Sequence, residues 1–284
     1  MTHTRRSRIA IVIALAAAAV AGCKGKESAP APTKETAKPP GELTVFAASS
    51  LREAFLDLEQ AFSAAHPDVQ ITFNFAGTQE LRAQIEHGAA VDVFAAADSK
   101  HMKELATAGA VVDPVVFARN EPVVVVARDR AAALTAFADL PKAARIVIGV
   151  PDVPIGRYTD QILGNAGSKL GAAVKAAIEA KIVSRELNVR QVLAKVSLGE
   201  ADAGIVYRTD AVTAADKVAV VAIPPEINVV AEYPIAVLKA APNTALAHAW
   251  LALVLSAAGQ ELLTKRGFLP AAAVAAAGGT QQTP

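Results

Sequence analysis

The chain has 284 residues, of which 53% are hydrophobic and 19% are charged, which is the balance of an ordinary globular protein. Its formal net charge of +1 argues against a nucleic-acid surface, so any affinity for an anion must come from a local site. A single cysteine, Cys23, excludes an intramolecular disulfide and a cysteine-based zinc cluster, and the five histidines lack metal-ligand spacing, so we expect neither a metal centre nor a cofactor.

Residues 1–22 are predicted to be a signal peptide. Arg5, Arg6 and Arg8 precede an apolar run at 9–20 that is short for a transmembrane helix. The sequence VAGC at 20–23 then resembles the lipobox of bacterial lipoproteins, in which cleavage occurs before a cysteine that becomes lipidated. The alternative is an ordinary signal with a cysteine nearby by chance, but the only cysteine stands where the box requires it. We therefore expect a lipid anchor on Cys23, at the periplasmic or extracellular face of a bacterial membrane.

Two segments flank the part of the chain that is expected to fold. Residues 23–41 carry the cysteine and then a run with four prolines and no large apolar residue, which predicts a flexible tether. Residues 271–284 are rich in Ala, Gly and Gln and are predicted to be a flexible tail.

Between these segments the pattern alternates between strand and helix. The first predicted elements are strands at 43–47, 69–75 and 92–95 and helices at 50–65 and 79–87, with Asp98 capping a further helix. Later strands are predicted at 122–127, 145–150, 203–207 and 234–238, followed by helices through 243–265. Such alternation predicts an α/β fold with parallel sheets that helices cover on both faces.

The segments that begin at Glu121-Pro122 and at Glu232-Tyr233-Pro234 look alike, because each leads into an apolar strand. We interpret them as crossover strands between two lobes, with a hinge near 120–121 and 233–234. One lobe would comprise 43–120 plus 234–270, and the other would comprise 121–233. In such sheets, ligands lie beyond the carboxyl ends of strands, where helix N termini offer unpaired N–H groups to an anion.

Several turns between strand and helix carry polar or small residues. They contain Ser50, Gly77-Thr78, the PDVPIGRY segment at 151–158, Asn188 before Val189, and Tyr207 at the end of a strand. Each of these has an ordinary structural interpretation as a helix cap, a rigid loop or a packing residue.

In combination, these segments resemble the periplasmic molybdate-binding proteins of ABC importers. The blocks VFAASSL, FAGTQEL, IEHGAAVDVFAAAD, VPIGRY, NVR and GIVYRTDA occur in order from Leu43 to Pro270. The resemblance implies a two-lobed type II periplasmic-binding-protein fold with the ligand cleft between the lobes. It also implies a monomer that binds a tetrahedral dianion, molybdate or tungstate, and delivers it to an ABC permease.

The resemblance also implies which groups would hold the anion. They are the hydroxyls and backbone N–H groups of Ser50 and Thr78, the backbone N–H groups of Ile155 and Val189, and the Tyr207 hydroxyl. Gly77 and Ile155 depart from the family pattern, in which we expect serine and a small residue. Arg157, Arg190 and Arg208 adjoin these positions, and we interpret them as solvated surface cations.

Two alternatives are compatible with parts of the pattern. Within the binding class, the ligand could be another oxyanion such as sulfate or phosphate. From another class, a hydrolase of phosphate or sulfate esters would need an activated nucleophile, and no serine motif here contains a histidine to activate it. We therefore expect a binding protein and not an enzyme.

Overall fold

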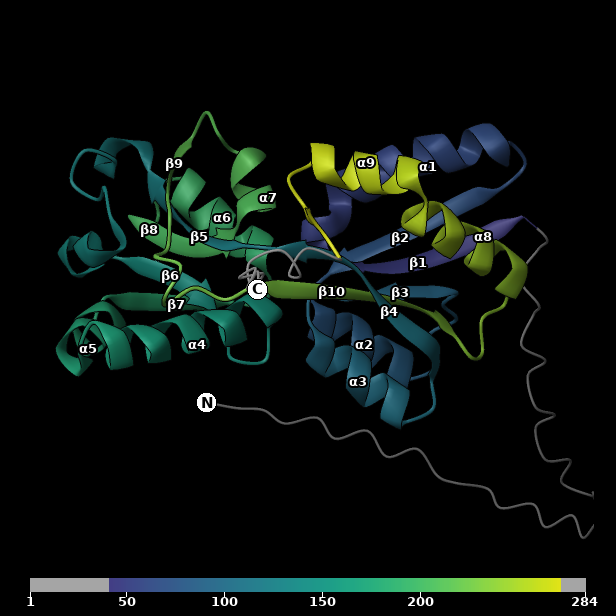
Figure 1. Cartoon of the computed structure of the whole chain (residues 1–284), viewed down its shortest axis with the longest axis horizontal. Helices are drawn as coiled ribbons and strands as arrows, with labels where there is room; N and C mark the ends of the chain where they lie inside the picture. Colours follow the sequence, from purple (N-terminus) through teal and green to yellow (C-terminus); the bar gives the residue numbers. More distant parts are fainter. Residues whose placement is uncertain (1–40, 272–284) are drawn as a thin grey trace, which may run out of the picture. The chain divides into compact units, whose positions relative to one another are not determined.

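The structure of the protein is a computed structural model that describes residues 41–271. The predicted signal peptide, Cys23, the linker as far as residue 40 and the tail from 272 lie outside the described residues. Two β-sheets organise the described chain, and each sheet defines one lobe (Figure 1). The predicted two-lobed α/β fold is therefore confirmed.

Lobe 1 is built on a six-stranded sheet of order β11-β4-β10-β3-β1-β2. Its elements are β1 (Glu42–Ala48), the 3-10 helix η1 (Ser49–Leu51), α1 (Arg52–Ala65), β2 (Gln70–Ala76), α2 (Thr78–Glu86), β3 (Val93–Ala95), α3 (Ser99–Thr107), β4 (Val111–Asn120), β10 (Ala231–Leu238), α8 (Thr244–Leu255), α9 (Ala257–Lys265) and β11 (Leu269–Pro270). Helices α1, α8 and α9 lie over one face of the sheet, and α2 and α3 lie over the other (Figure 1).

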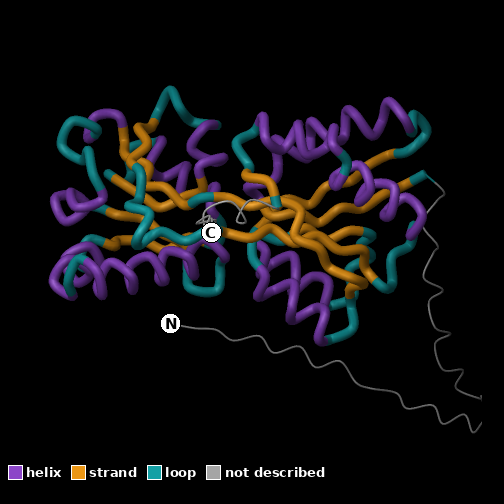
Figure 2. The backbone as a smooth tube through the Cα atoms, viewed as in Figure 1, coloured by secondary structure: helices purple, strands orange, loops and turns teal. Residues whose placement is uncertain are grey.

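Lobe 2 is built on a five-stranded sheet of order β7-β6-β8-β5-β9. Its elements are β5 (Pro122–Ala127), the 3-10 helices η2 (Arg128–Arg130) and η3 (Phe137–Lys142), β6 (Ile146–Gly149), α4 (Pro154–Lys169), α5 (Ala172–Glu179), β7 (Ile182–Glu186), α6 (Val189–Ser197), β8 (Ala203–Tyr207), α7 (Arg208–Val212) and β9 (Val218–Val221). Figure 2 shows the strands in the middle of each lobe with helices outside them.

The prediction of parallel sheets is wrong in part, because both sheets are mixed. Strands β1, β2 and β3 are parallel, as are β6, β7 and β8, but β10 runs antiparallel to β3 and β4, and β5 runs antiparallel to β8 and β9. The reason is the crossover. β4 carries the chain toward lobe 2 and β10 carries it back, so the two strands pair in opposite directions.

Two chain crossings join the lobes. β4 ends at Asn120, and β5 begins two residues later at Pro122. On the return, β10 begins at Ala231, which already pairs with Asn120, so the second crossing lies in the segment before Ala231. Tyr233 and Pro234 therefore lie inside the sheet of lobe 1 rather than at the hinge.

Helix α1 shows how the sequence pattern produces packing. The apolar residues Leu51, Ala54, Phe55, Leu58 and Phe62 recur at helical spacing, and all are buried. The ring of Phe55 lies 5.6 Å from that of Trp250 on α8, which is fully buried. This face closes the core of lobe 1 against the sheet and thereby positions η1 at the carboxyl end of β1.

In residues 41–271 we find no single helix that is long and apolar enough to cross a membrane, although α8 and α9 would meet that requirement together if they were not bent by 64°.

Candidate functional site

The five residues that were predicted to bind the anion line one cavity between the lobes. Lobe 1 contributes Ser50 and Thr78, and lobe 2 contributes Ile155, Val189 and Tyr207. The lining of the cavity comes from both lobes, so an oxyanion held there would contact both lobes at once. None of the described residues that line it has a charged side chain. A site of this kind can hold an anion only by hydrogen bonds from neutral donors.

Helix N termini converge on the cavity. Thr78 is the first residue of α2, Ile155 is the second residue of α4, and Val189 is the first residue of α6. The first N–H groups of a helix have no partner within the helix, and the helix dipole is positive there. Asn188 caps α6 by accepting from the Gln191 N–H at 3.1 Å, which leaves the Val189 N–H available to the cavity.

Ser50 is oriented by a residue from far along the sequence. Its Oγ lies 2.9 Å from the hydroxyl oxygen of Tyr233, and Asn120 Nδ2 donates to that same Tyr233 oxygen at 3.4 Å. Either hydroxyl can donate in the Ser50–Tyr233 hydrogen bond, and this bond holds Ser50 Oγ in place at the cavity wall. The sequence analysis missed both Tyr233 and Asn120, since nothing local links either to Ser50.

Thr78 is oriented in a similar way. Its Oγ1 accepts the backbone N–H of Ala97 at 3.2 Å, and Ala97 also lines the cavity. With this lone pair occupied, the Thr78 hydroxyl retains its proton for a ligand. Gly77 is the N-cap of α2, and its N–H donates to Glu80 Oε2 at 3.3 Å.

The Tyr207 hydroxyl is buried and has no hydrogen-bond partner among the described residues. Burial raises the pKa of Tyr207 well above its ordinary value, and the neighbouring Tyr233 and Tyr158 raise it further. The hydroxyl therefore keeps its proton at any physiological pH and can only be satisfied by an acceptor in the cavity. An unsatisfied buried donor costs about 1–3 kcal/mol, so this group favours binding of an anion.

Metal binding was not expected from the sequence. In residues 41–271 no group of three or more His, Cys, Asp or Glu side chains lies close enough together to hold a metal ion.

The interpretation of Arg157 and Arg190 as solvated surface cations is wrong. Both side chains are only 24% exposed, and both are paired with buried carboxylates. Arg157 lies 2.6 Å from Asp98 of lobe 1, and Arg190 lies 2.7 Å from Asp210 and also contacts Glu53 of lobe 1. Sequence reasoning missed these pairs because each arginine meets its acid through the packing of distant segments.

Arg208, the third arginine, agrees better with the prediction. Its side chain is 42% exposed and pairs with Glu121, which is 37% exposed, at 2.7 Å. The pair lies at the crossover and involves no residue of the cavity. Among the three arginines, only Arg157 and Arg190 reach fully buried acids.

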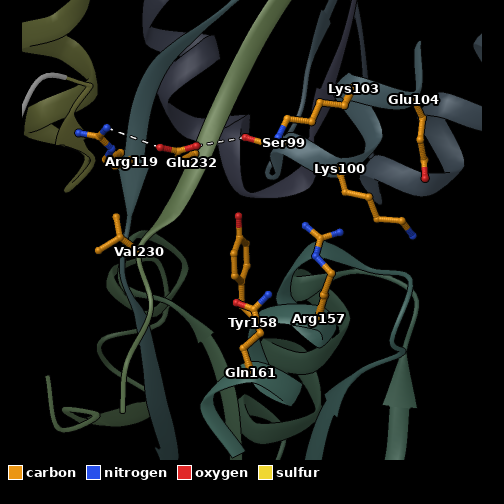
Figure 3. A pocket seen from close by; sticks show the side chains of 10 residues that line it. All are labelled: Ser99, Lys100, Lys103, Glu104, Arg119, Arg157, Tyr158, Gln161, Val230 and Glu232. Atoms are coloured by element: carbon orange, nitrogen blue, oxygen red, sulfur yellow. Dashed lines mark hydrogen bonds and ion pairs between the residues drawn. The ribbon is translucent and has the colours of Figure 1, made fainter. Parts of the chain in front are cut away.

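A second, larger groove of about 670 Å³ lies beside α3 and α4 (Figure 3). Lys100, Lys103 and Arg119 face it from lobe 1, and Arg157 and Tyr158 face it from lobe 2. Tyr158 also packs edge-on to Tyr207 with ring centroids 6.4 Å apart, so this groove adjoins the wall of the small cavity.

Comparison with known proteins gives consistent matches over most of the chain. A family model described as bacterial extracellular solute-binding protein matches residues 43–269. The molybdate-binding protein ModA of Mycobacterium tuberculosis is 38% identical over 260 residues, covering 91% of this chain and 95% of that protein. The putative ABC transporter substrate-binding lipoprotein YvgL of Bacillus subtilis is 33% identical, covering 68% of this chain and 70% of that protein.

A solved structure agrees with these matches. The substrate-binding domain of a putative molybdenum ABC transporter from Clostridium difficile is 31% identical, with a TM-score of 0.62, and the match covers 81% of this chain and 98% of that domain. The residues matched by the family model include all five that line the cavity from the two lobes.

Proposed function

The chain belongs to the family of bacterial extracellular solute-binding proteins, and we propose that it captures molybdate outside the cytoplasm and delivers it to an ABC permease. Tungstate, which has the same charge and shape, is expected to bind as well. The observation that carries the proposal is the buried Tyr207 hydroxyl, which has no hydrogen-bond partner among residues 41–271 and belongs to a residue that lines a cavity of neutral groups. Relatives that are named for molybdate support the identity of the anion.

The chemistry of the cavity favours a fully ionised tetrahedral oxyanion. Such an anion is purely an acceptor, and the cavity offers hydroxyl and N–H donors from both lobes. Protonated phosphate would need a carboxylate to accept its proton, and none lines the cavity. Sulfate carries the same charge and is the alternative within this class. We expect the cavity to discriminate against it by size.

We further propose that the protein binds this anion without reacting with it. The alternative, hydrolysis of phosphate or sulfate esters, would require a nucleophile activated by a neighbouring base. Among the described residues that line the cavity there is no histidine, aspartate or glutamate to act as that base. Release of phosphate or sulfate from an aryl ester at a rate above background would contradict the proposal.

Molybdate is expected to raise the melting temperature of the protein strongly. A ligand at a thousand times its Kd stabilises the native state by about 4.1 kcal/mol. For a domain of this size, each kcal/mol shifts the melting temperature by about 2–4 °C, so a shift of about 8–16 °C is expected. Differential scanning fluorimetry of residues 24–284 with molybdate, tungstate, sulfate and phosphate would measure it. A larger shift with sulfate or phosphate than with molybdate would contradict the assignment.

We also propose that Cys23 carries the lipid anchor, in agreement with the B. subtilis relative named as a lipoprotein. The change Cys23→Ser is expected to release the protein from membranes or to leave residues 1–22 uncleaved, because the cysteine is both the cleavage signal and the acylated residue. Membrane fractionation and intact mass spectrometry of the exported protein would measure this. An unmodified Cys23 in the unaltered protein would contradict it.

A further inference from the structure

Arg157 and Asp98 connect the two lobes directly behind the anion cavity. Arg157 is on α4 of lobe 2, two residues after Ile155, and Asp98 is the N-cap of α3 in lobe 1. Their charged atoms, Arg157 Nη2 and Asp98 Oδ2, lie 2.6 Å apart. Figure 3 shows Arg157 pointing from α4 toward the start of α3. This ion pair can form only when the lobes are in contact.

Each partner is tied to a donor of the cavity. Asp98 directly follows Ala97, whose N–H donates to Thr78 Oγ1 at 3.2 Å. Arg157 lies one turn into the helix whose first residues present the Ile155 N–H. The pair thus fixes the distance between a donor segment of lobe 1 and a donor segment of lobe 2.

The charge of Asp98 makes this contact important for an anion. Its side chain is fully buried, one residue from the cavity wall, and a bare carboxylate there would repel a dianion. The nearby Tyr207 hydroxyl senses this charge, because Asp98 is among the groups that raise the pKa of Tyr207 after burial and the two tyrosines. Arg157 neutralises the carboxylate without entering the cavity itself.

Other groups around the pair contribute less to the neutralisation. His101 Nε2 lies 3.8 Å from Asp98 Oδ2, but it donates its hydrogen bond to the Asp152 carbonyl at 2.8 Å. Lys100 pairs with Asp152 at 2.6 Å across the lobes, and these two side chains are 43% and 52% exposed. Exposed pairs contribute little, so Arg157 is the main counter-charge of Asp98.

We propose that Arg157 is a positioning residue for the bound anion, which acts through Asp98: it holds the lobes together around the ligand and neutralises a buried carboxylate that would otherwise repel it. This inference rests on the proposed function, since it needs an anionic ligand. It predicts that Arg157 contributes to affinity without contacting the anion.

The test is a double-mutant cycle between Arg157→Met and Asp98→Asn. Methionine keeps an apolar stem but removes the charge. Asparagine removes the carboxylate charge but can still accept from the His101 N–H and cap α3, which Asp98 does at 3.0 Å. The matched control is Arg208→Met, which also removes an arginine beside a cavity residue, but one whose acid is exposed.

Calorimetry and stopped-flow dissociation with sodium molybdate would measure the four proteins of the cycle and the control. Arg157→Met is expected to weaken binding by about ten- to hundredfold, mostly through faster dissociation, because removing one partner leaves a buried charge unpaired. In the Asp98→Asn background, Arg157→Met should weaken binding less than threefold. The control Arg208→Met, made in the otherwise unaltered protein, should also weaken binding less than threefold. Arg157→Lys should restore part of the loss. Equal losses in both backgrounds, or no loss at all, would overturn the inference.

A second measurement tests whether Arg157 holds the lobes in contact when no ligand is present. Spin labels on Val183→Cys in lobe 2 and Leu255→Cys in lobe 1, in a Cys23→Ser background, report the separation of the lobes, since both positions are exposed. Arg157→Met is expected to shift the ligand-free distance distribution toward larger separations. If the unaltered protein fails to bind molybdate, the proposed function is wrong. Separately, if Arg157→Met leaves the ligand-free distance distribution unchanged, the role of Arg157 in lobe contact is overturned, whether or not molybdate binds.

Discussion

The change Gly77→Ala is expected to reduce the affinity for molybdate by about a hundredfold while leaving the ligand-free protein folded. A Cβ on Gly77 would lie 2.5 Å from the carbonyl oxygen of Leu187, which belongs to lobe 2. The backbone of Gly77, at φ −63° and ψ 138°, is open to alanine, so lobe 1 itself is not strained. The added methyl group therefore opposes only the contact between the lobes, and overpacking at such a contact costs about 1–3 kcal/mol.

A second effect adds to this loss. Gln79 Nε2 donates to the same Leu187 carbonyl at 2.8 Å, and its side chain also approaches the place of the new methyl group. Displacing it removes a hydrogen bond between the lobes. Titration calorimetry gives the affinity, and the melting temperature without ligand reports folding. Gly164→Ala is the matched control, because a Cβ there meets no atom within 4 Å. Unchanged affinity in Gly77→Ala would show that the lobes bind the anion at a larger separation.

Tyr207→Phe is expected to weaken molybdate binding by about ten- to hundredfold, which corresponds to about 1.5–3 kcal/mol for a hydrogen bond to a charged group. The ring stays packed against Tyr158 and Tyr233, so the change removes only the hydroxyl. Because that hydroxyl has no partner among the described residues, its removal should leave the ligand-free protein as stable or more stable. Opposite signs of the effects on stability and on affinity would identify it as a ligand-binding group.

The same measurement separates side-chain donors from backbone donors. Ser50→Ala and Thr78→Val should each weaken binding by a similar factor, whereas Ile155→Val and Val189→Ala should retain most of the affinity because the N–H donor survives. Valine is chosen at position 155 because Ile155 is fully buried, and a larger truncation would leave a cavity in the core. Calorimetry on these four variants and on Tyr207→Phe would test this. If the backbone-donor variants lost as much as the hydroxyl variants, the assignment of donors would be wrong.

The sequence by itself determined the α/β class and most of the elements, and its resemblance to a known family implied five of the residues that line the cavity. This was possible because each of these features is local. The apolar spacing of α1 is present within one helix, and Ser50, Thr78, Ile155, Val189 and Tyr207 all lie where a strand gives way to a helix. The strands that were not predicted are β4, β7, β9 and the two-residue β11. β4 contains Asp113-Pro114, which interrupts its apolar run. The residues of β7 alternate between partly buried and exposed, and none is fully buried, so its sequence lacks the apolar face of a core strand.

Only the tertiary structure decided how these residues are supported. Ser50 meets Tyr233 across 183 positions, Arg157 meets Asp98, and Gly77 lies against the Leu187 carbonyl of the other lobe. The arginines in particular look like surface residues in the sequence and prove to be half-buried partners of buried acids. The physical reason is that a hydrogen bond or ion pair depends on distances of a few ångströms between distant segments. Those distances are set by how whole lobes pack, and local periodicity carries no record of them.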